Sequence, residues 1–191
     1  AQDVATQDSG ALTGEVSGPQ LARLGVRYVI IGHSERRWKL GESDEVTNEK
    51  LKAALRAGLT PIVCLGERTR DGEWQDALAL QTVATLKGLT EGQMSQCLIA
   101  YEPVWAISTN PDAKPDTPAS AVQSMNFIRE TIADQFNVSH PTFLYGGSVT
   151  PDNAASFLER AEVSGVLIGG ASVRVDDFCR ILSIASSLPT E

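Results

Sequence analysis

The sequence predicts an α/β fold in which strands alternate with helices. Five apolar runs of strand length recur about every 22 to 45 residues along the 191-residue chain, a period typical of βα units in a parallel sheet. The runs are continuously apolar, as in strands that are buried on both faces. Glycines stop most of them, and stretches with helical spacing follow. We therefore expect one domain over residues 1–191.

The first βα unit follows a polar, glycine-rich segment that we expect to be a loop. Ser17 or Gly18 can begin a short helix that reaches Leu24, and Gly25 is a natural stop. The β-branched and aromatic run 26–31 predicts the first strand.

The next two units repeat this order. Ser43 can cap a helix that ends at Gly58, and Thr60–Leu65 is the second predicted strand. A long helical stretch from Glu73 to Lys87 leads to the third strand at Cys97–Tyr101.

Two Thr-Pro pairs mark the last units, because a capping residue followed by proline favours a helix start. Thr117-Pro118 follows a loop from Ser108 to Asp116 and begins a helix to about Phe136, and Thr150-Pro151 begins another. The remaining predicted elements are strands at Phe143–Tyr145 and Val163–Ile168 and a final helix at Asp176–Ser187.

Composition excludes several functional classes. Sixteen Lys and Arg residues against 24 Asp and Glu give a net charge of −8, so we expect no nucleic-acid partner. No apolar stretch approaches the roughly 20 residues that span a bilayer, so we expect no membrane partner. Three scattered cysteines and two histidines predict no disulfide framework, no metal site and a reducing, cytoplasmic location.

Polar and glycine residues gather just after the predicted strands. Periodicity alone does not separate a doubly wound sheet from a piece of a barrel. Such residues at the carboxyl ends of successive parallel strands are typical of the working face of a (β/α)₈ barrel. The segments are Gly32–Arg37, Gly66–Arg68, Glu102–Trp105, Gly146–Ser148 and Gly169–Ser172.

His33 and Glu102 are the candidates for acid–base chemistry. A histidine at a helix N-terminus feels the positive end of the dipole, which favours a neutral imidazole able to polarise a carbonyl; a histidine satisfied by local backbone is the alternative. A carboxylate that ends an apolar strand is partly desolvated and suits proton abstraction from carbon. An ion-paired strand-end carboxylate is the alternative for Glu102.

Other polar residues have weaker signals. The backbone at Gly169-Gly170, with Ser148, suits a phosphate, although tight packing explains a Gly-Gly turn equally well. We interpret Arg36 and Arg37 as structural ion-pair partners.

Together these segments resemble triosephosphate isomerase. The matching runs cover nearly the whole chain in family order: residues 30–37, 61–64, 100–107, 145–149 and 167–172. The resemblance implies interconversion of dihydroxyacetone phosphate and glyceraldehyde 3-phosphate, a step of glycolysis and gluconeogenesis, without metal or cofactor. It also implies a truncated (β/α)₈ TIM barrel of about five βα units, strands 4–8, that lacks the first two strands and most of the third.

By this resemblance, Glu102 is the base, His33 the neutral electrophile and Glu35 a second carboxylate behind the site. The same pairing of a glutamate base with a neutral histidine is a known case of pKa tuning in this enzyme. Phosphate contacts fall to Ser108 in the lid and to Ser148, Gly169 and Gly170.

The chain also departs from the family. The strand-one lysine and asparagine have no counterpart, and the lid has Ser108 and Asn110 in place of glycines and Pro111-Asp112 in place of Lys-Thr. We therefore expect much reduced activity; the alternative is an inactive remnant that binds phosphate or has a structural role.

Open strand edges predict self-association. Five strands of a barrel leave two unpaired edges and an apolar face, and the family dimerises through the loop at residues 10–15. We therefore expect a homo-oligomer, a dimer or larger.

Overall fold

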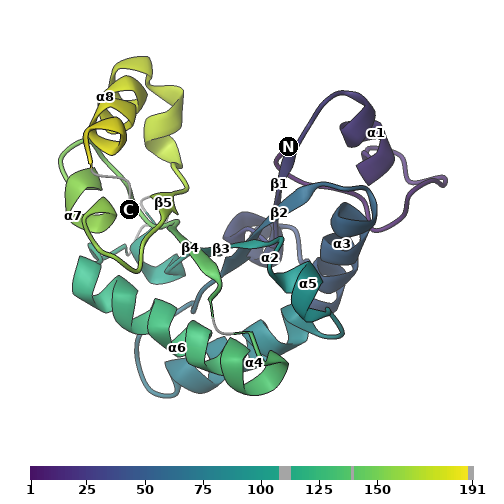
Figure 1. Ribbon diagram of the computed structural model, residues 1–191, viewed down its shortest axis with the longest axis horizontal. Helices are drawn as coiled ribbons and strands as arrows, with labels where there is room; N and C mark the ends of the chain where they lie inside the picture. The colour runs from purple at the N-terminus through teal and green to yellow at the C-terminus, as the bar shows by residue number, and fades with distance from the viewer. Residues whose placement is uncertain (108–112, 139, 189–191) are drawn as a thin grey trace.

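The predicted α/β class is confirmed by the computed structural model, which describes residues 1–107, 113–138 and 140–188. One parallel sheet holds five strands in the order β1-β2-β3-β4-β5. Figure 1 shows that the sheet is open, with α1 and the N-terminal segment on one side and α7 and α8 on the other. The strands are β1 (Tyr28–Ile31), β2 (Thr60–Leu65), β3 (Leu98–Tyr101), β4 (Thr142–Tyr145) and β5 (Gly165–Val166).

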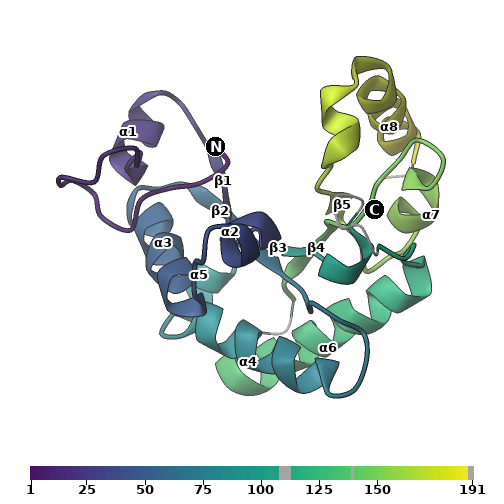
Figure 2. The same ribbon diagram turned by 180° about the vertical axis from the view of Figure 1, so that it is seen from behind.

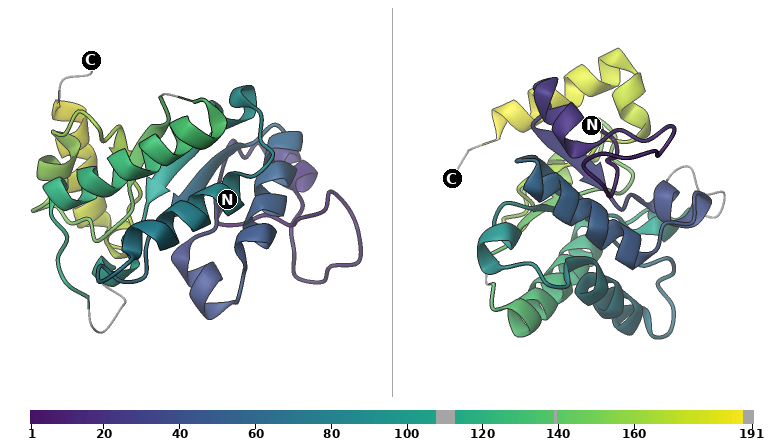
Figure 3. Two further views of the ribbon diagram at one scale, coloured as in Figure 1. Left: turned by 90° about the horizontal axis from the view of Figure 1, so that it is seen from below. Right: turned by 90° about the vertical axis from the view of Figure 1, so that its right-hand side faces the viewer.

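Helices α3, α4 and α6 cover one face of this sheet, whereas α7 and α8 lie beside β5 (Figures 2 and 3). The short α5 was not predicted from the sequence. The helical bounds are α1 (Gly18–Arg23), α2 (Ser34–Lys39), α3 (Asp44–Arg56), α4 (Trp74–Leu86), α5 (Glu91–Met94), α6 (Pro118–Phe136), α7 (Ala154–Leu158) and α8 (Val175–Ser187), with 3₁₀ turns η1 (Val104–Ala106) and η2 (Gly170–Val173).

Side-chain caps explain where α3 and α6 begin. Ser43 Oγ accepts the backbone N–H of Val46, and Thr117 Oγ1 accepts that of Ser120, which confirms both predicted starts. The start predicted at Thr150-Pro151 is early: the backbone N–H of Thr150 donates to Asn153 Oδ1 (2.8 Å). This bond closes a turn, and α7 begins only at Ala154.

The two faces of the sheet differ in burial because side chains alternate along each strand. The face under the helices is fully buried and includes Val29, Ile31, Val63, Tyr101 and Tyr145. On the opposite side, which we call the inner face, several large apolar side chains are only half-buried, although Cys64 and Ala100 on that side are buried. The inner face is defined by Ile30, Ile62, Leu98 and Leu144.

The two edges of the sheet are finished differently. Ala1 pairs with β1, since its N-terminal ammonium donates to Tyr28 O (2.7 Å) and its carbonyl accepts the N–H of Ile30 (2.9 Å). The last strand is shorter than the predicted 163–168, because its ladder covers two residues and bonds to β4 alone within the described sheet. Strand β5 is therefore an edge strand.

Candidate active site

The predicted site residues follow strands that all point the same way. In a parallel sheet the carboxyl ends of the strands lie along one edge. His33 comes two residues after β1, Glu102 directly after β3, and Ser148 three residues after β4. The fold therefore gathers residues that are far apart in the sequence at one end of the sheet.

Two glycines place the backbone of this site. Gly32 has φ +71°, a left-handed conformation that favours glycine, and a Cβ there would meet Thr47 Cγ2 at 2.6 Å. The chain turns there, so that His33 becomes the N-cap of α2. Gly66 allows β2 and β3 to approach, because a Cβ on it would lie 1.9 Å from the carbonyl oxygen of Glu102.

The Glu102 carboxylate is buried, with 2% of the residue exposed. Its Oε2 accepts the backbone N–H of Ser34 (2.8 Å), and its Oε1 accepts the Ser34 hydroxyl (2.9 Å). His33 Nε2 lies 2.9 Å from the same Oε1. A candidate base and a candidate hydrogen-bond donor thus lie side by side, although β2 separates their strands.

The hydrogen bonds of His33 indicate its tautomer. Nδ1 accepts the backbone N–H of Glu35 (3.3 Å), so in the neutral ring the proton lies on Nε2 and faces Glu102. The helix N-terminus favours this neutral form, as expected from the sequence. However, the hydrogen bond to the Glu102 carboxylate raises the pKa of His33 above its ordinary value, against the opposing effect of burial. The sequence-based expectation omitted this carboxylate.

A histidine titration tests this pairing. In Glu102→Gln the amide carries no charge, so we expect the pKa of His33 to fall from its raised value; NMR titration of the imidazole measures it. The sign follows from linkage: a raised pKa in the folded state stabilises the fold below the unfolded pKa, and this contribution is lost as pH rises through the folded pKa. An unchanged His33 pKa in the variant would contradict the assignment.

The other predicted residues have more exposed positions. The Glu35 carboxylate is half-exposed and pairs with Lys39 Nζ (2.9 Å), and only the backbone N–H of Glu35 donates to His33. Ser148 is half-buried, and Gly169 and Gly170 are exposed where η2 begins. Ser108 lies outside the described residues.

The structural interpretation of the two arginines is confirmed. Arg36 Nη2 pairs with Asp3 (2.9 Å) and Glu42 (2.6 Å). Arg37 is buried and pairs with Asp44. Both guanidinium groups are thus paired with carboxylates.

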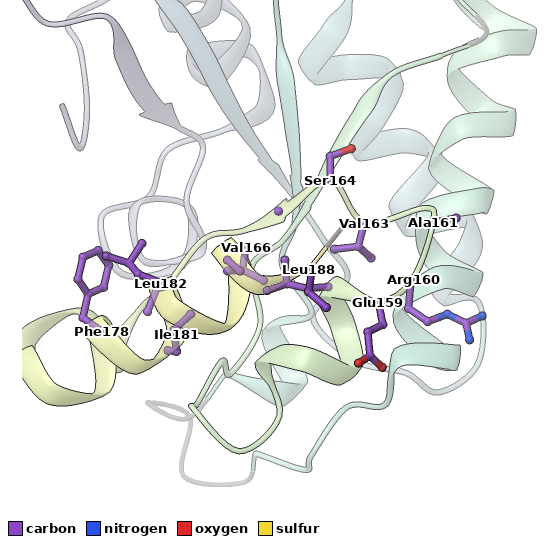
Figure 4. A pocket seen from close by; sticks show the side chains of 14 residues that line it. Glu159, Arg160, Ala161, Val163, Ser164, Val166, Phe178, Ile181, Leu182 and Leu188 are labelled. Carbon is purple, nitrogen blue, oxygen red and sulfur yellow. The ribbon is translucent and has the colours of Figure 1, made fainter. Parts of the chain in front are cut away.

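A cavity of about 860 Å³ lies elsewhere, between α7, β5 and α8 (Figure 4). Its walls are mainly apolar, and His33 and Glu102 are not among its lining residues. It follows the unpaired edge of β5. The cavity therefore belongs to the open edge of the sheet and is separate from the candidate active site. Its apolar lining includes Val163, Val166, Phe178, Ile181, Leu182 and Leu188.

The environment of Cys64 is unfavourable for nucleophilic chemistry. Burial raises the pKa of the Cys64 thiol well above its ordinary value, so this thiol is a poor nucleophile. Across residues 1–107, 113–138 and 140–188, no group of three or more His, Cys, Asp or Glu side chains could hold a metal ion. In the same residues, no helix has the length and apolarity to cross a membrane.

Sequence reasoning assigned no role to two residues that shape this site. Ser34 stands next to His33 in a segment already singled out, and its hydroxyl can donate a hydrogen bond to a carboxylate. Glu67 lies two residues after β2, is 3% exposed, and contacts Tyr101 and Trp105 on either side of Glu102. A charged residue soon after an apolar strand was the available signal.

Comparison with known proteins identifies the family of the chain. The family model described as triosephosphate isomerase matches residues 1–185. The triosephosphate isomerase of Caldanaerobacter subterraneus subsp. tengcongensis is 42% identical over 189 residues, which cover 96% of this chain and 75% of that protein. The crystal structure of triosephosphate isomerase from Bartonella henselae superposes with a TM-score of 0.83 at 36% identity, over 98% of this chain and 76% of that one.

Proposed function

Because the chain belongs to the triosephosphate isomerase family, we propose that it interconverts dihydroxyacetone phosphate and glyceraldehyde 3-phosphate with Glu102 as base and His33 as electrophile. The observation that carries this proposal is the 2.9 Å approach of His33 Nε2 to Glu102 Oε1. A carbonyl and its neighbouring carbon, bound at this point, would meet a hydrogen-bond donor and a proton acceptor together.

The reaction is an isomerisation in which protons move within the substrate and no atom is gained or lost. Glu102 removes a proton from the carbon next to the carbonyl, and His33 donates a hydrogen bond from Nε2 to the oxygen that gains charge. A proton then moves from the hydroxyl oxygen to the former carbonyl oxygen at the enediol stage. Glu102 delivers its proton to the former carbonyl carbon, so that the carbonyl has moved by one carbon and Glu102 is again a carboxylate. Among the described residues, the backbone N–H and hydroxyl of Ser34 and the imidazole of His33 hold Glu102, so substrate must replace part of these bonds before the carboxylate can act.

Phosphate binding is proposed for Ser148 and for the backbone at Gly169 and Gly170. These residues follow β4 and β5, adjacent strands of the sheet, which is where barrels of this type often hold phosphate. Ser108 and Glu35 retain the roles that the family resemblance gives them, as proposals. Turnover below that of the relatives is part of the proposal, because the lid sequence has Ser108 and Asn110 in place of the glycines expected from the family.

The five strands are interpreted as strands 4–8 of an eight-stranded barrel. Their sequential, all-parallel order supports this interpretation, as does superposition on 76% of the Bartonella chain.

We place the protein in a reducing compartment such as the cytoplasm, because Cys64, Cys97 and Cys179 are free thiols.

Self-association is proposed on the basis of exposed apolar surface. The inner face is half-buried, and Leu12 and Val16 are 41% and 44% exposed in and beside the N-terminal loop that projects in Figure 1. Light scattering at micromolar concentration should give a mass of two chains or more, against 20.4 kDa for one. A monomer over that range would contradict the proposal.

A coupled isomerase assay on the purified chain tests the function. Turnover above that of a Glu102→Gln preparation, which carries the same host contaminants, is the expected result. Calorimetric binding of a triose phosphate without turnover would contradict isomerase activity and support the alternative, a chain that binds phosphate without catalysis.

A further inference from the structure

A buried cluster on the helix-covered side of the sheet surrounds the segment that carries Glu102. Glu67, two residues after β2, uses one carboxylate oxygen, Oε1, for several bonds. This oxygen accepts the hydroxyl of Tyr101 (2.8 Å) and the indole N–H of Trp105 (3.0 Å). Glu67 therefore holds the residue just before Glu102 and the third residue after it.

The backbone contacts follow the same course. The N–H of Glu102 donates to Leu65 O (2.8 Å), and the N–H of Val104 donates to Glu67 O (3.1 Å). The main chain on both sides of Glu102 is thus bonded to residues 65–67. A displacement of Glu67 would be transmitted to Glu102 through these bonds.

Arg70 joins this cluster to the start of α6. Its Nη1 donates to Glu67 Oε1 (2.8 Å) and to the hydroxyl of Ser124, and its Nη2 donates to Gln123 Oε1 (3.0 Å). The guanidinium also lies 3.8 Å from the ring centroid of Trp74. One side chain therefore connects the turn after Glu102 with the helix that follows the next loop.

We propose that Arg70 is a positioning residue for catalysis, which acts through Glu67 to fix the segment Tyr101–Trp105 and so the Glu102 carboxylate. The inference rests on the isomerase function proposed above. Glu67 Oε2 is buried and has no hydrogen-bond partner among the described residues. Compensation of the negative charge on this carboxylate therefore depends strongly on the Arg70 guanidinium. A buried carboxylate that loses its paired cation is left uncompensated, and its neighbours must rearrange.

The size of the effect follows from the geometry of proton transfer. A general base must reach its proton within about 2.6–3.2 Å between heavy atoms, and a misplacement of about 1 Å can cost about 100-fold in rate. Among the described residues, the contacts of Arg70 do not include Ser148, Gly169 or Gly170, which are proposed to hold phosphate. Loss of Arg70 should therefore lower kcat while leaving KM nearly unchanged.

Steady-state kinetics of four variants test this inference. We expect Arg70→Met to lower kcat about 10- to 100-fold with KM within about threefold of wild type. The kcat of Arg70→Lys should lie between those of Arg70→Met and wild type, because lysine keeps the charge but lacks the planar guanidinium that reaches Glu67 and α6 together. Glu67→Gln should lower kcat as well, and the double variant should lose less than the product of the two single losses, since both act through one contact.

A spectroscopic signature separates positioning from general destabilisation. The chain has three tryptophans, and NMR can follow their indole N–H groups. The Trp105 signal should move in Arg70→Met and in Glu67→Gln, whereas that of Trp38 should stay. The matched control is Arg180→Met, which removes an arginine that is 63% exposed and loosely paired with Asp152; kcat and both signals should stay unchanged.

Distinct outcomes overturn distinct claims. In an active wild-type chain, an Arg70→Met variant with unchanged kcat, or with raised KM and unchanged kcat, overturns the positioning role. Independent, multiplicative losses in the double variant also overturn it. A wild-type chain without turnover overturns the proposed function and, with it, the catalytic role of Arg70.

Discussion

Replacing Glu102 by glutamine is expected to lower kcat by about 10²- to 10⁴-fold, the range usual for loss of a general base. Glutamine has nearly the same shape and keeps one oxygen to accept a bond from Ser34, but its amide cannot take a proton from carbon. Steady-state assay of the purified variant measures the loss. The folded state should persist, because the substitution changes neither volume nor packing.

Two further variants sharpen this test. Glu102→Asp keeps the carboxylate but shortens the side chain by one methylene, so its kcat should lie between those of wild type and glutamine variant. Glu45→Gln removes an exposed carboxylate from the first turn of α3 and should leave kcat unchanged. If Glu102→Gln turned over substrate as wild type does, the base would have to be another group.

The largest effect on stability is expected at Arg37. This buried side chain donates from Nε to Gly32 O (2.7 Å) and from Nη2 to Thr85 Oγ1 (3.1 Å), and it pairs with Asp44. Arg37→Met removes one partner from each of these interactions and should reduce the free energy of unfolding by about 3–5 kcal/mol. Urea unfolding followed by circular dichroism would show this as a lower midpoint.

Arg56→Met is the matched control for Arg37→Met. Arg56 pairs with Asp8 at the surface, and both side chains are about half-exposed. Solvent screens such a pair, so its loss should cost at most about 1 kcal/mol. Equal midpoints for the two variants would contradict a supporting role for Arg37 beneath the turn at Gly32.

Local sequence patterns predicted most of the secondary structure. β2 and the starts of α3 and α6 were correct to the residue or nearly so, because capping residues, proline and glycine act over a few neighbouring positions. The start of α7 and the extent of β5 were wrong. Contacts that local patterns do not show decided both outcomes. The bond of Thr150 to Asn153 delays the start of α7, and β5 is short because only β4 pairs with it in the described sheet.

The candidate site was partly predictable for the same reason. His33 and Glu102 follow apolar strands, and the residues at strand ends share one edge of a parallel sheet. Their identity as candidates thus came from the sequence. The sequence did not show that Glu102 would be held by Ser34, nor that its charge would raise the pKa of His33.

By itself, the sequence determined the strand–helix order, the residue types at the strand ends and the family. These depend on short-range periodicity and on matched motifs. Tertiary structure alone decided which side chains meet. It brings His33 to Glu102 across 69 positions. It also brings Glu67, which follows β2, to Tyr101 in β3 and to Trp105 in η1. The reason is physical, because charge, burial and hydrogen bonding act through space, and the fold sets those distances.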